Sequence, residues 1–368
     1  MRRPTQRPDR ALSPRGDTTQ RRDLSPTITA ERVPAIARHL RASAPPTVAV
    51  IIVNFNSGRH LLRCLQSLND QSTTTDRMIV VDNASTDDSM REVRRRFPHV
   101  EIIRLSKNVG FAAANNIAIR RLDNADWIAL LNADAFPEPQ WLESLMDAAM
   151  RRPEFDALAC PMLRDGDPTR GDGNGDVYHV SGFAWRDQCG LPVSNSSLVE
   201  REVFGACAAA ACYRRQALVA CGGFDERFFC YFEDVDLAFR LRLAGRRCLL
   251  VPRAIVRHVG SAVTGRRSAF TVYHAQRNLE WTWFKNMPTP LLWWYLPPHL
   301  FLMLVSVAWF TLRGQGGVIC RAKWSAFASL RTLWRQRQDV QSTRQVSITA
   351  LRRRMARGWF SPYFRSRK

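Results

Sequence analysis

The amino-acid sequence predicts an α/β protein built on a parallel β-sheet, with helices on both faces and a helical region at the C-terminus. Short apolar runs alternate with amphipathic segments four times, and each run ends in polar residues. This alternation is typical of strand–loop–helix units, whose right-handed connections make the strands parallel. The dinucleotide signature G-x-G-x-x-G and the phosphate loop G-x-x-x-x-G-K-[ST] are both absent from the sequence. The absence of these motifs argues against a nicotinamide enzyme and a P-loop kinase.

The four predicted units lie between residues 48 and 150. Strands are expected over residues 48–53, 78–81, 100–105 and 127–131. The helices that follow them are expected over residues 61–68, up to 97, 112–122 and 141–150. In open α/β sheets ligands bind beyond the carboxyl ends of the strands, so the polar residues at those ends are candidate ligand contacts.

The fourth apolar run ends in Asn132-Ala133-Asp134, with two polar side chains one residue apart. Asp134 is where a metal ion or a phosphate would be expected at this edge of the sheet. An Asp that merely begins the turn before Pro137 explains the same pattern, and this stretch alone leaves both interpretations open.

Further elements are predicted after residue 150. An Asp- and Gly-rich run, residues 165–176, has the composition of a flexible surface loop. We expect strands over residues 205–213 and 249–252, and between them a helix that runs to Gly245. Glu233 and Asp234 fall in the first turn of this helix, where carboxylates suit the helix dipole. His258 follows the last strand, and a lone histidine is more often structural than a ligand.

The formal charge of +21 is concentrated in the two ends of the 368-residue chain. Residues 1–47 contribute +6 and residues 313–368 contribute +13, whereas the middle of the chain is nearly neutral. A nucleic-acid-binding domain would carry its basic stripe on the folded core, so we expect no nucleic-acid partner. Basic segments beside an apolar, Trp-rich stretch favour an anionic membrane surface instead.

The N-terminal residues 1–46 are rich in Arg, Pro, Ser and Thr and contain no aromatic side chain. We expect a disordered basic tail with one short helix over residues 34–42, and no secretory signal because a continuous apolar run is missing. Nine cysteines are spread singly without a C-x-x-C pair, which argues against a zinc site and a disulfide framework and for a reducing compartment. The sequence therefore favours catalysis on the cytoplasmic side.

The sequence contains seven short motifs whose residues and order resemble those of glycosyltransferase family 2, and within it the bacterial rhamnosyltransferase-like members. The resemblance runs from about Val48 to Gly265. The motifs are Val53-Asn54-Phe55-Asn56, Val81-Asp82-Asn83-Ala84-Ser85-Thr86-Asp87, Asn108-Val109-Gly110-Phe111, Asn132-Ala133-Asp134-Ala135, Gly223-Phe224-Asp225-Glu226, Phe232-Glu233-Asp234-Val235-Asp236 and His258-Val259-Gly260-Ser261.

The resemblance implies a GT-A fold, in which a nucleotide-binding half joins an acceptor-binding half, and an inverting sugar transfer from a nucleotide-sugar. Asp82 matches the position that binds the pyrimidine base; the other implied nucleotide-binding residues are Asn54, Asn56, Asn83, Asn108, Gly110 and Asn132. Asp134 matches the last acid of a D-x-D metal motif whose first acid is Asn132 here, and His258 matches a further ligand of the same divalent cation, Mg²⁺ or Mn²⁺.

Asp234 matches the catalytic base of the family, and Glu233 lies beside it. Such a base on the face of the sugar opposite the leaving phosphate can remove the proton of an attacking acceptor hydroxyl. The subgroup implies dTDP-rhamnose as the donor and a lipid-linked acceptor, a polyprenyl-diphosphate sugar. The resemblance thus implies partners of two kinds, a nucleotide-sugar donor and a lipid-linked or cell-surface glycan acceptor.

The composition changes after residue 278, and eight of the eleven tryptophans lie in residues 281–368. Residues 291–312 are mostly apolar but are interrupted by Pro297 and Pro298, which leaves a continuous run of 13 residues where a membrane span needs about 20. An interfacial or re-entrant segment, a single span and a soluble packing surface all remain open. Residues 324–334 have the pattern of a basic amphipathic helix.

The sequence therefore predicts a tail (1–46), a GT-A catalytic domain (47–265) and a helical, basic, membrane-associated region (266–368) at the cytoplasmic face of the membrane. The alternatives are a nucleotidyltransferase acting on sugar phosphates and a non-catalytic sugar-nucleotide-binding protein. The segment Asn54 to His60 lacks the glycine-rich basic loop that nucleotidyltransferases usually carry, and the intact Glu233-Asp234 pair argues against a non-catalytic protein.

Overall fold

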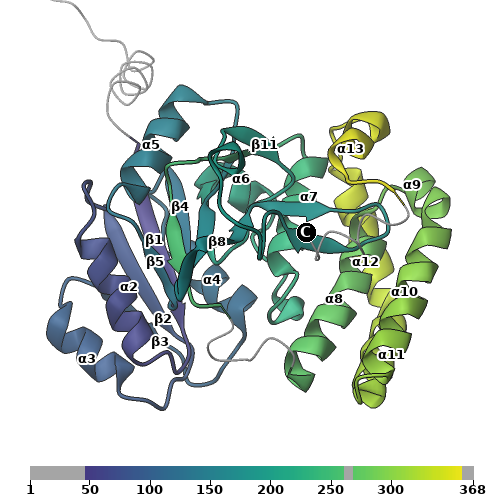
Figure 1. Ribbon diagram of the computed structural model, residues 1–368, viewed down its shortest axis with the longest axis horizontal. Helices are drawn as coiled ribbons and strands as arrows, with labels where there is room; N and C mark the ends of the chain where they lie inside the picture. Colours follow the sequence, from purple (N-terminus) through teal and green to yellow (C-terminus); the bar gives the residue numbers. More distant parts are fainter. Residues whose placement is uncertain (1–45, 261–267, 359–368) are drawn as a thin grey trace, which may run out of the picture. The chain divides into compact units, whose positions relative to one another are not determined.

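The computed structural model describes residues 46–260 and 268–358. Its central element is a mixed β-sheet of eight strands (Figure 1). The strand order is β11-β13-β6-β12-β4-β1-β2-β3. The predicted tail and its helix over residues 34–42 lie outside the described residues. The first four strands are β1 (Val48–Asn54), β2 (Arg77–Asp82), β3 (Glu101–Arg104) and β4 (Trp127–Asn132). The remaining four are β6 (Ala157–Ala159), β11 (Arg201–Val203), β12 (Ala210–Arg214) and β13 (Cys248–Leu250).

Strands β1 to β4 are mutually parallel, as the sequence predicts, and their carboxyl ends meet at one edge of the sheet. Asn54 at the end of β1 pairs with Asp82 at the end of β2, and Val53 pairs with Asn132 of β4. The polar residues of the three strand ends therefore lie along one edge.

Helices cover both faces of this sheet. Successive side chains of a strand point to opposite faces, and in β1 the side chains on both faces are apolar and buried. Val48, Val50 and Ile52 share one apolar core with α2, α3 and α5. Ala49 and Ile51 share a second core with α4, α6 and α7. The helices are α2 (Arg59–Asn69), α3 (Ser89–Arg96), α4 (Phe111–Ile119), α5 (Trp141–Arg151), α6 (Arg215–Ala220) and α7 (Glu233–Leu243).

The strand expected over residues 205–213 is shorter in the structure, because β12 begins only at Ala210. β12 is antiparallel to both of its neighbours, β4 and β6, so the parallel arrangement holds only for part of the sheet. The preceding segment packs against α7, where a Cβ on Gly205 would collide with that of Ala238 in the middle of the helix. The amide of Ala208 donates to Asp234 of α7 rather than to a strand, which explains why no strand forms there.

The prediction of a flexible loop over residues 165–176 is wrong. This run forms β8 (Asp167–Asn174) and the start of β9 (Asp176–Tyr178), and β8 belongs to a four-stranded sheet of order β5-β14-β7-β8. Asp172, Asn174 and Asp176 are buried. Charged partners from distant segments compensate the burial of Asp172, and composition alone does not reveal such partners. The other strands of the four-stranded sheet are β5 (Ala135–Pro137), β7 (Pro161–Arg164) and β14 (Val256–His258), and β9 pairs with β10 (Ala184–Arg186) in a separate two-stranded sheet.

The C-terminal part of the described chain is helical, and its long helices lie side by side beyond α7 (Figure 1). The predicted amphipathic helix of residues 324–334 is divided between α11 and α12, with a break at Ser329. The apolar stretch of residues 291–312 is likewise divided between α9 and α10. The helices are α8 (Ala269–Asn286), α9 (Thr289–Trp294), α10 (Leu296–Thr311), α11 (Gly316–Ala328), α12 (Leu330–Ser342) and α13 (Ile348–Arg354).

None of the helices in the described ranges is long and apolar enough to cross a membrane. Pro297 and Pro298 occupy the first turn of α10, where a missing N–H costs little, so the prolines start a new helix instead of continuing α9.

Large exposed apolar side chains gather on the helices from α9 to α12. Of the fourteen such side chains among the described residues, ten fall in residues 293–334, and we call these ten the tryptophan face. They are Trp293, Trp294, Leu300, Phe301, Leu304, Trp309, Leu312, Trp324, Phe327 and Trp334. An exposed apolar patch of this kind indicates an interaction surface.

Gly110, which precedes α4, supports a testable prediction about packing. Its φ of +86° favours glycine, and an added Cβ would lie 2.6 Å from the carbonyl oxygen of Phe229. Gly314 has a similar φ of +77°, but a Cβ there would meet nothing within 4 Å. We expect Gly110→Ala to lower the free energy of unfolding by about 1–3 kcal/mol more than Gly314→Ala, measured by urea denaturation. Equal losses would contradict the close approach of Phe229.

Candidate active site

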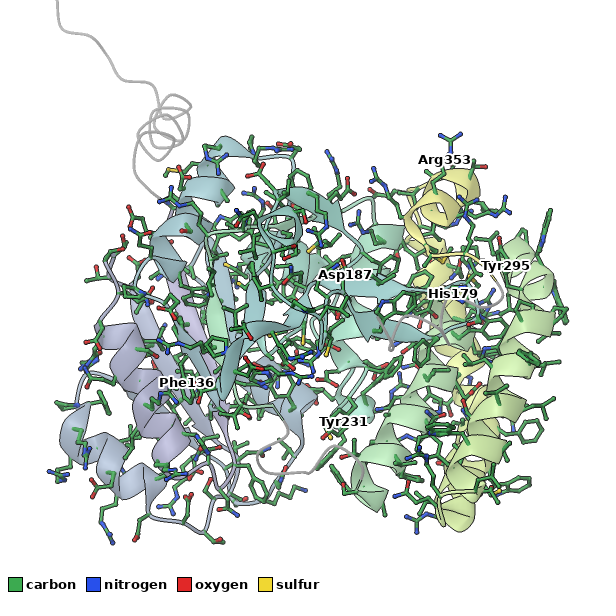
Figure 2. All side chains as sticks on the ribbon, viewed as in Figure 1. Phe136, His179, Asp187, Tyr231, Tyr295 and Arg353 are labelled. Atoms are coloured by element: carbon green, nitrogen blue, oxygen red, sulfur yellow. The ribbon has the colours of Figure 1, made fainter. Side chains whose placement is uncertain are left out.

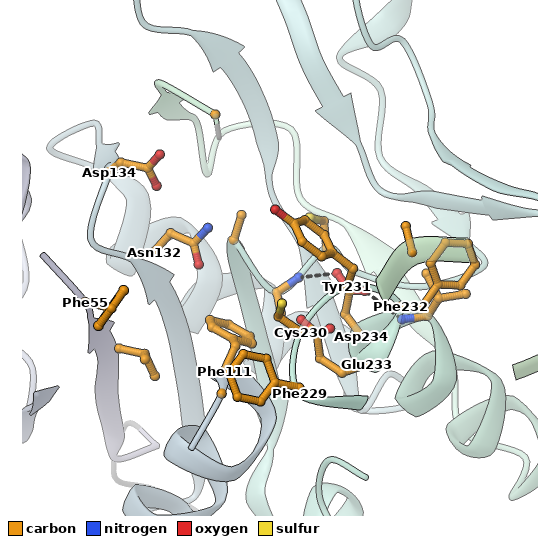
Figure 3. A pocket seen from close by; sticks show the side chains of 18 of the residues that line it. Phe55, Phe111, Asn132, Asp134, Phe229, Cys230, Tyr231, Phe232, Glu233 and Asp234 are labelled. Atoms are coloured by element: carbon orange, nitrogen blue, oxygen red, sulfur yellow. Dashed lines mark hydrogen bonds between the residues drawn. The ribbon is translucent and has the colours of Figure 1, made fainter. Parts of the chain in front are cut away.

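A cavity of about 510 Å³ opens at the carboxyl edge of the parallel strands (Figure 3). One wall comes from the ends of β1 and β4 and from the loops after β2 and β3. The opposite wall comes from β9, β10, the segment before β12 and the turn that leads into α7. Asn132 and Asp134 lie on the first side, and Glu233 and Asp234 lie on the second (Figure 3).

Four of the seven predicted nucleotide-binding residues line this cavity: Asn83, Asn108, Gly110 and Asn132. The side-chain amide of Asn83 donates to Asn108 Oδ1 at 2.8 Å and accepts from the amide of Val109 at 2.9 Å. Asn108 Oδ1 also accepts from the amide of Gly110 at 2.9 Å. The loops after β2 and β3 are therefore linked into one cavity wall.

The other three predicted nucleotide-binding residues, Asn54, Asn56 and Asp82, do not line the cavity. The Asn54 side chain is buried and donates to the hydroxyls of Ser85 and Ser89 at 2.9 and 3.1 Å. Asn56 accepts from the amide of Thr86 at 2.8 Å. All three residues hydrogen-bond to the segment that follows β2, between Ser85 and Ser89.

Asp82 is fully buried at the end of β2. Its Oδ1 accepts from the amide of Ser85 at 3.0 Å, and its Oδ2 lies 3.4 Å from Nε of the largely exposed Arg104. Its match to the base-binding position of the family remains a prediction.

The two predicted metal ligands meet in space because β14 pairs with β5, with His258 opposite Ala135. His258 Nε2 lies 3.3 Å from Asp134 Oδ1. The other ring nitrogen, Nδ1, lies 2.7 Å from Asp172 Oδ2, which also accepts from Arg186 at 2.6 Å. A carboxylate on the far nitrogen fixes the orientation and tautomer of a metal-binding histidine.

The electrostatics of this pair follow from its burial and its charges. Burial favours the neutral forms, but the attraction between His258 and the carboxylates of Asp134 and Asp172 outweighs it. The pKa of His258 is therefore raised and the pKa of Asp134 is lowered. The ionised form of Asp134 is thus favoured.

The residues fit a divalent cation that is held partly by its substrate. His258 Nε2 is buried and has no well-aligned hydrogen-bond partner among the described residues, as expected of a nitrogen reserved for a ligand. The same residues contain no cluster of three or more His, Cys, Asp or Glu side chains able to hold a metal ion. Mg²⁺ is commonly bound through one or two carboxylates plus substrate phosphates, so a two-residue site is chemically sufficient.

Glu233 and Asp234 begin α7, as the sequence predicts, but their environments differ. Asp234 Oδ2 accepts from the amide of Ala208 at 3.1 Å, and its Oδ1 accepts from the amide of Val235 at 2.8 Å. Glu233 is buried, and burial, together with the charge of Asp234, holds the pKa of Glu233 well above its usual range. Two adjacent carboxyl groups in different surroundings can take different roles.

The sequence analysis missed three residues of the site: Asp172, Asp176 and Arg186. Asp176 and Arg186 line the cavity and are paired across β9 and β10. Asp176 is buried near Asp234, and burial is the main reason why its pKa lies well above the usual range. The alternation of Asp with Gly over residues 172–176 was the available signal, but its composition is also that of a loop.

The comparisons with known proteins agree on the family. The family model of glycosyl transferase family 2 matches residues 49–219. An N-acetylglucosaminyl-diphospho-decaprenol L-rhamnosyltransferase of Mycobacterium tuberculosis is 32% identical over 241 residues, which is 60% of this chain and 78% of the relative. The O-antigen biosynthesis protein RfbC of Myxococcus xanthus is 28% identical over 262 residues, or 68% of this chain and 20% of that protein.

The fold is also similar to that of a solved structure, GalNAc-T7 with UDP, GalNAc and Mn²⁺. The TM-score is 0.53 at 15% identity, over 65% of this chain and 48% of the other. The predicted α/β fold of GT-A type is therefore confirmed. With the fold and the relatives in agreement, the chain belongs to glycosyltransferase family 2 and is a rhamnosyltransferase-like enzyme.

Proposed function

We propose that the protein is an inverting, metal-dependent glycosyltransferase that moves rhamnose from dTDP-rhamnose to a lipid-linked acceptor. One observation carries the proposal: the Asp134–His258 pair and the Asp234 carboxylate line the same cavity from opposite halves of the fold. The acceptor class follows from the relative of Mycobacterium tuberculosis, whose name specifies a GlcNAc-diphospho-decaprenol substrate. For this chain we therefore propose a polyprenyl-diphosphate sugar.

The nucleotide of the donor would lie on the side of Asn83, Asn108, Gly110 and Asn132, with Asn54, Asn56 and Asp82 supporting this wall. Side-chain amides can hydrogen-bond a base and a ribose without a glycine-rich phosphate loop. Gly110 lets the start of α4 approach the turn at Phe229, which closes this end of the cavity.

Asp134 and His258 would hold a divalent cation, Mg²⁺ or Mn²⁺, next to the donor diphosphate. A bound cation acts as a Lewis acid that neutralises charge on the leaving phosphates. Asp172 and Arg186 hold the far side of His258, so Nε2 stays directed toward Asp134.

Asp234 would act as the general base, with Glu233 as its buried neighbour, whose pKa is raised chiefly by burial. In the reaction the acceptor oxygen forms a bond to the anomeric carbon as the bond from that carbon to the diphosphate breaks. The acceptor hydroxyl proton passes to Asp234, and the nucleoside diphosphate leaves. The amides of Ala208 and Val235 fix both oxygens of Asp234, which orients the carboxylate for this transfer.

The tryptophan face would bind the cytoplasmic surface of the membrane as a peripheral or re-entrant contact. Tryptophans suit the interface of a bilayer, and residues 313–368 supply +13 of charge for anionic headgroups. The guanidinium of Arg313 lies 3.9 Å from the ring centre of Trp309, so apolar and basic groups occur together here. We also propose residues 47–265 as the catalytic part and 266–368 as the membrane-associated part.

Replacing the proposed base tests the catalytic assignment. We expect Asp234→Asn to lower the rate of rhamnose transfer by about 10²–10⁴-fold, because general base catalysis is lost while the shape of the side chain is kept. Binding of dTDP, measured by calorimetry, should stay within about threefold because the nucleotide lies on the other wall. Asp147→Asn, an exposed substitution on α5, is the control. Near-normal turnover of Asp234→Asn would remove Asp234 from this role.

Removing the metal tests the role of Asp134 and His258. We expect a chelator to abolish transfer and Mn²⁺ to restore it. We also expect Mn²⁺ to strengthen dTDP binding to the native protein by about tenfold or more, but not to strengthen its binding to Asp134→Ala. Activity that is unchanged by chelation, or equal Mn²⁺ dependence in Asp134→Ala, would contradict the proposed cation site.

Vesicle binding tests the proposed membrane contact. We expect the protein to sediment with phosphatidylglycerol vesicles, and the double variant Trp293→Ser/Trp324→Ser to bind at least about tenfold more weakly because two large apolar side chains are lost. Met150→Ser removes an exposed apolar side chain of α5 and serves as the control. Binding of the double variant equal to that of the control would place the contact elsewhere.

A further inference from the structure

The turn that leads into α7 has a strained backbone. Phe229, Tyr231 and Phe232 have φ values of +66°, +66° and +68°, in the left-handed region that side chains other than glycine rarely adopt. Each such residue costs on the order of 1–3 kcal/mol and persists only where the surroundings hold it. Asp234 follows this turn by two residues, so the turn determines where its carboxylate lies (Figure 3).

One buried side chain of α8 holds most of this turn. The amide nitrogen of Asn278 lies 2.9 Å from the carbonyl oxygen of Phe228, 3.0 Å from that of Cys230 and 2.7 Å from that of Tyr231. Asn278 is completely buried. Its two N–H groups are therefore shared among three carbonyl oxygens of the turn.

The two remaining carbonyls of the turn bind to elements of the active site. The carbonyl oxygen of Phe229 accepts from the amide of Ala112 in α4 at 3.2 Å, and that of Phe232 accepts from the amide of Asp236 in α7 at 2.9 Å. All five carbonyls from 228 to 232 are thus bound. Asn278 is the donor to those of Cys230 and Tyr231, and it shares that of Phe228 with the amide of Cys230 at 2.8 Å and with Arg277 at 3.2 Å. Tyr231 lies beside the first turn of α8, where its hydroxyl is 3.3 Å from that of Thr271 (Figure 2).

A second contact from α8 fixes the ends of the same segment. The buried ammonium of Lys285 lies 2.7 Å from Asp225 Oδ2 and 2.7 Å from Asp236 Oδ1. The turn between these two carboxylates is therefore attached to α8 at both ends and, through Asn278, along its middle. This attachment explains how three strained residues are tolerated within four positions of the chain.

We propose that Asn278 is a positioning residue for the catalytic carboxylate: it holds the strained turn of residues 228–232 and thereby sets the position of Asp234. The inference rests on the proposed role of Asp234 as the base. Asn278 does not line the cavity and contacts no reacting group, so it acts only through the turn. A displacement of about 1 Å at a reacting group can cost about 10²-fold in rate.

The test compares Asn278→Ala with Gln71→Ala. Gln71 is a matched control, because its amide also bridges two carbonyls, those of Ser67 and Glu138, but it lies outside the cavity wall. We expect Asn278→Ala to lower kcat for rhamnose transfer on the order of 10²-fold, with dTDP affinity within about threefold of the native protein. Gln71→Ala should keep kcat within about threefold even if its melting temperature falls as far.

A double variant separates positioning from a general loss of structure. If Asn278 acts through Asp234, then Asn278→Ala/Asp234→Asn should be no slower than Asp234→Asn alone. A rate reduced by the product of the two single effects would overturn the proposal, as would native kcat in Asn278→Ala. If Asn278→Ala does not fold, Asn278→Ser, which keeps one donor, replaces it and should give an intermediate kcat.

The proposed function and this inference fail in different ways. No sugar transfer by the native protein, or native kcat in Asp234→Asn, would reject the proposed function. Native transfer that depends on Asp234 but not on Asn278 would reject the inference alone.

Discussion

The candidate active site depends on the antiparallel pairing of β14 with β5. β5 follows the end of β4, and β14 comes from a segment more than 100 residues later in the chain. This pairing brings His258 within 3.3 Å of Asp134 and attaches the sheet of β7 and β8 to the edge of the parallel strands. Without it His258 would not reach Asp134 at this edge of the sheet.

Burial of charge is the cost of this arrangement, and a network of opposite charges offsets it. Asp172 lies between His258 and Arg186 and is almost completely buried. A buried carboxylate without partners would be strongly destabilising, so Asp172, His258 and Arg186 stabilise one another only as a set. The same network orients the nitrogen of His258 that faces Asp134, and folding and the proposed metal chemistry therefore depend on the same contacts.

Local patterns predicted the first half of the fold well because its strands and helices are local units. The run of Val and Ile in β1 and the polar residues after it identify a strand and its carboxyl end without knowledge of distant contacts. The same reasoning did not show that Asn54 and Asp82 are buried and hydrogen-bonded to the loop after β2, since their orientation depends on that loop. Position at a strand end indicates nearness to a site, but not whether the side chain enters it.

Other features were not predictable from the sequence because they depend on long-range contacts. The local sequence around Asp172 predicts a loop, because it does not show that His258 and Arg186 lie beside this carboxylate. The sequence shows Asn278 only as one polar residue of an amphipathic helix. Its contacts with the carbonyl oxygens of residues 228–232 appear only in the folded structure. The break at Ser329 similarly divides one predicted helix into α11 and α12.

The central claim is that one base and one cation site, on opposite walls of one cavity, transfer the sugar in a single displacement. The most direct test is the anomeric configuration of the product, measured by nuclear magnetic resonance after transfer from dTDP-rhamnose to a soluble polyprenyl-diphosphate-GlcNAc analogue. The account predicts a product whose anomeric configuration is opposite to that of the donor. A product that retains the donor configuration would contradict it, because attack by the acceptor oxygen from the side opposite the leaving diphosphate inverts the anomeric carbon.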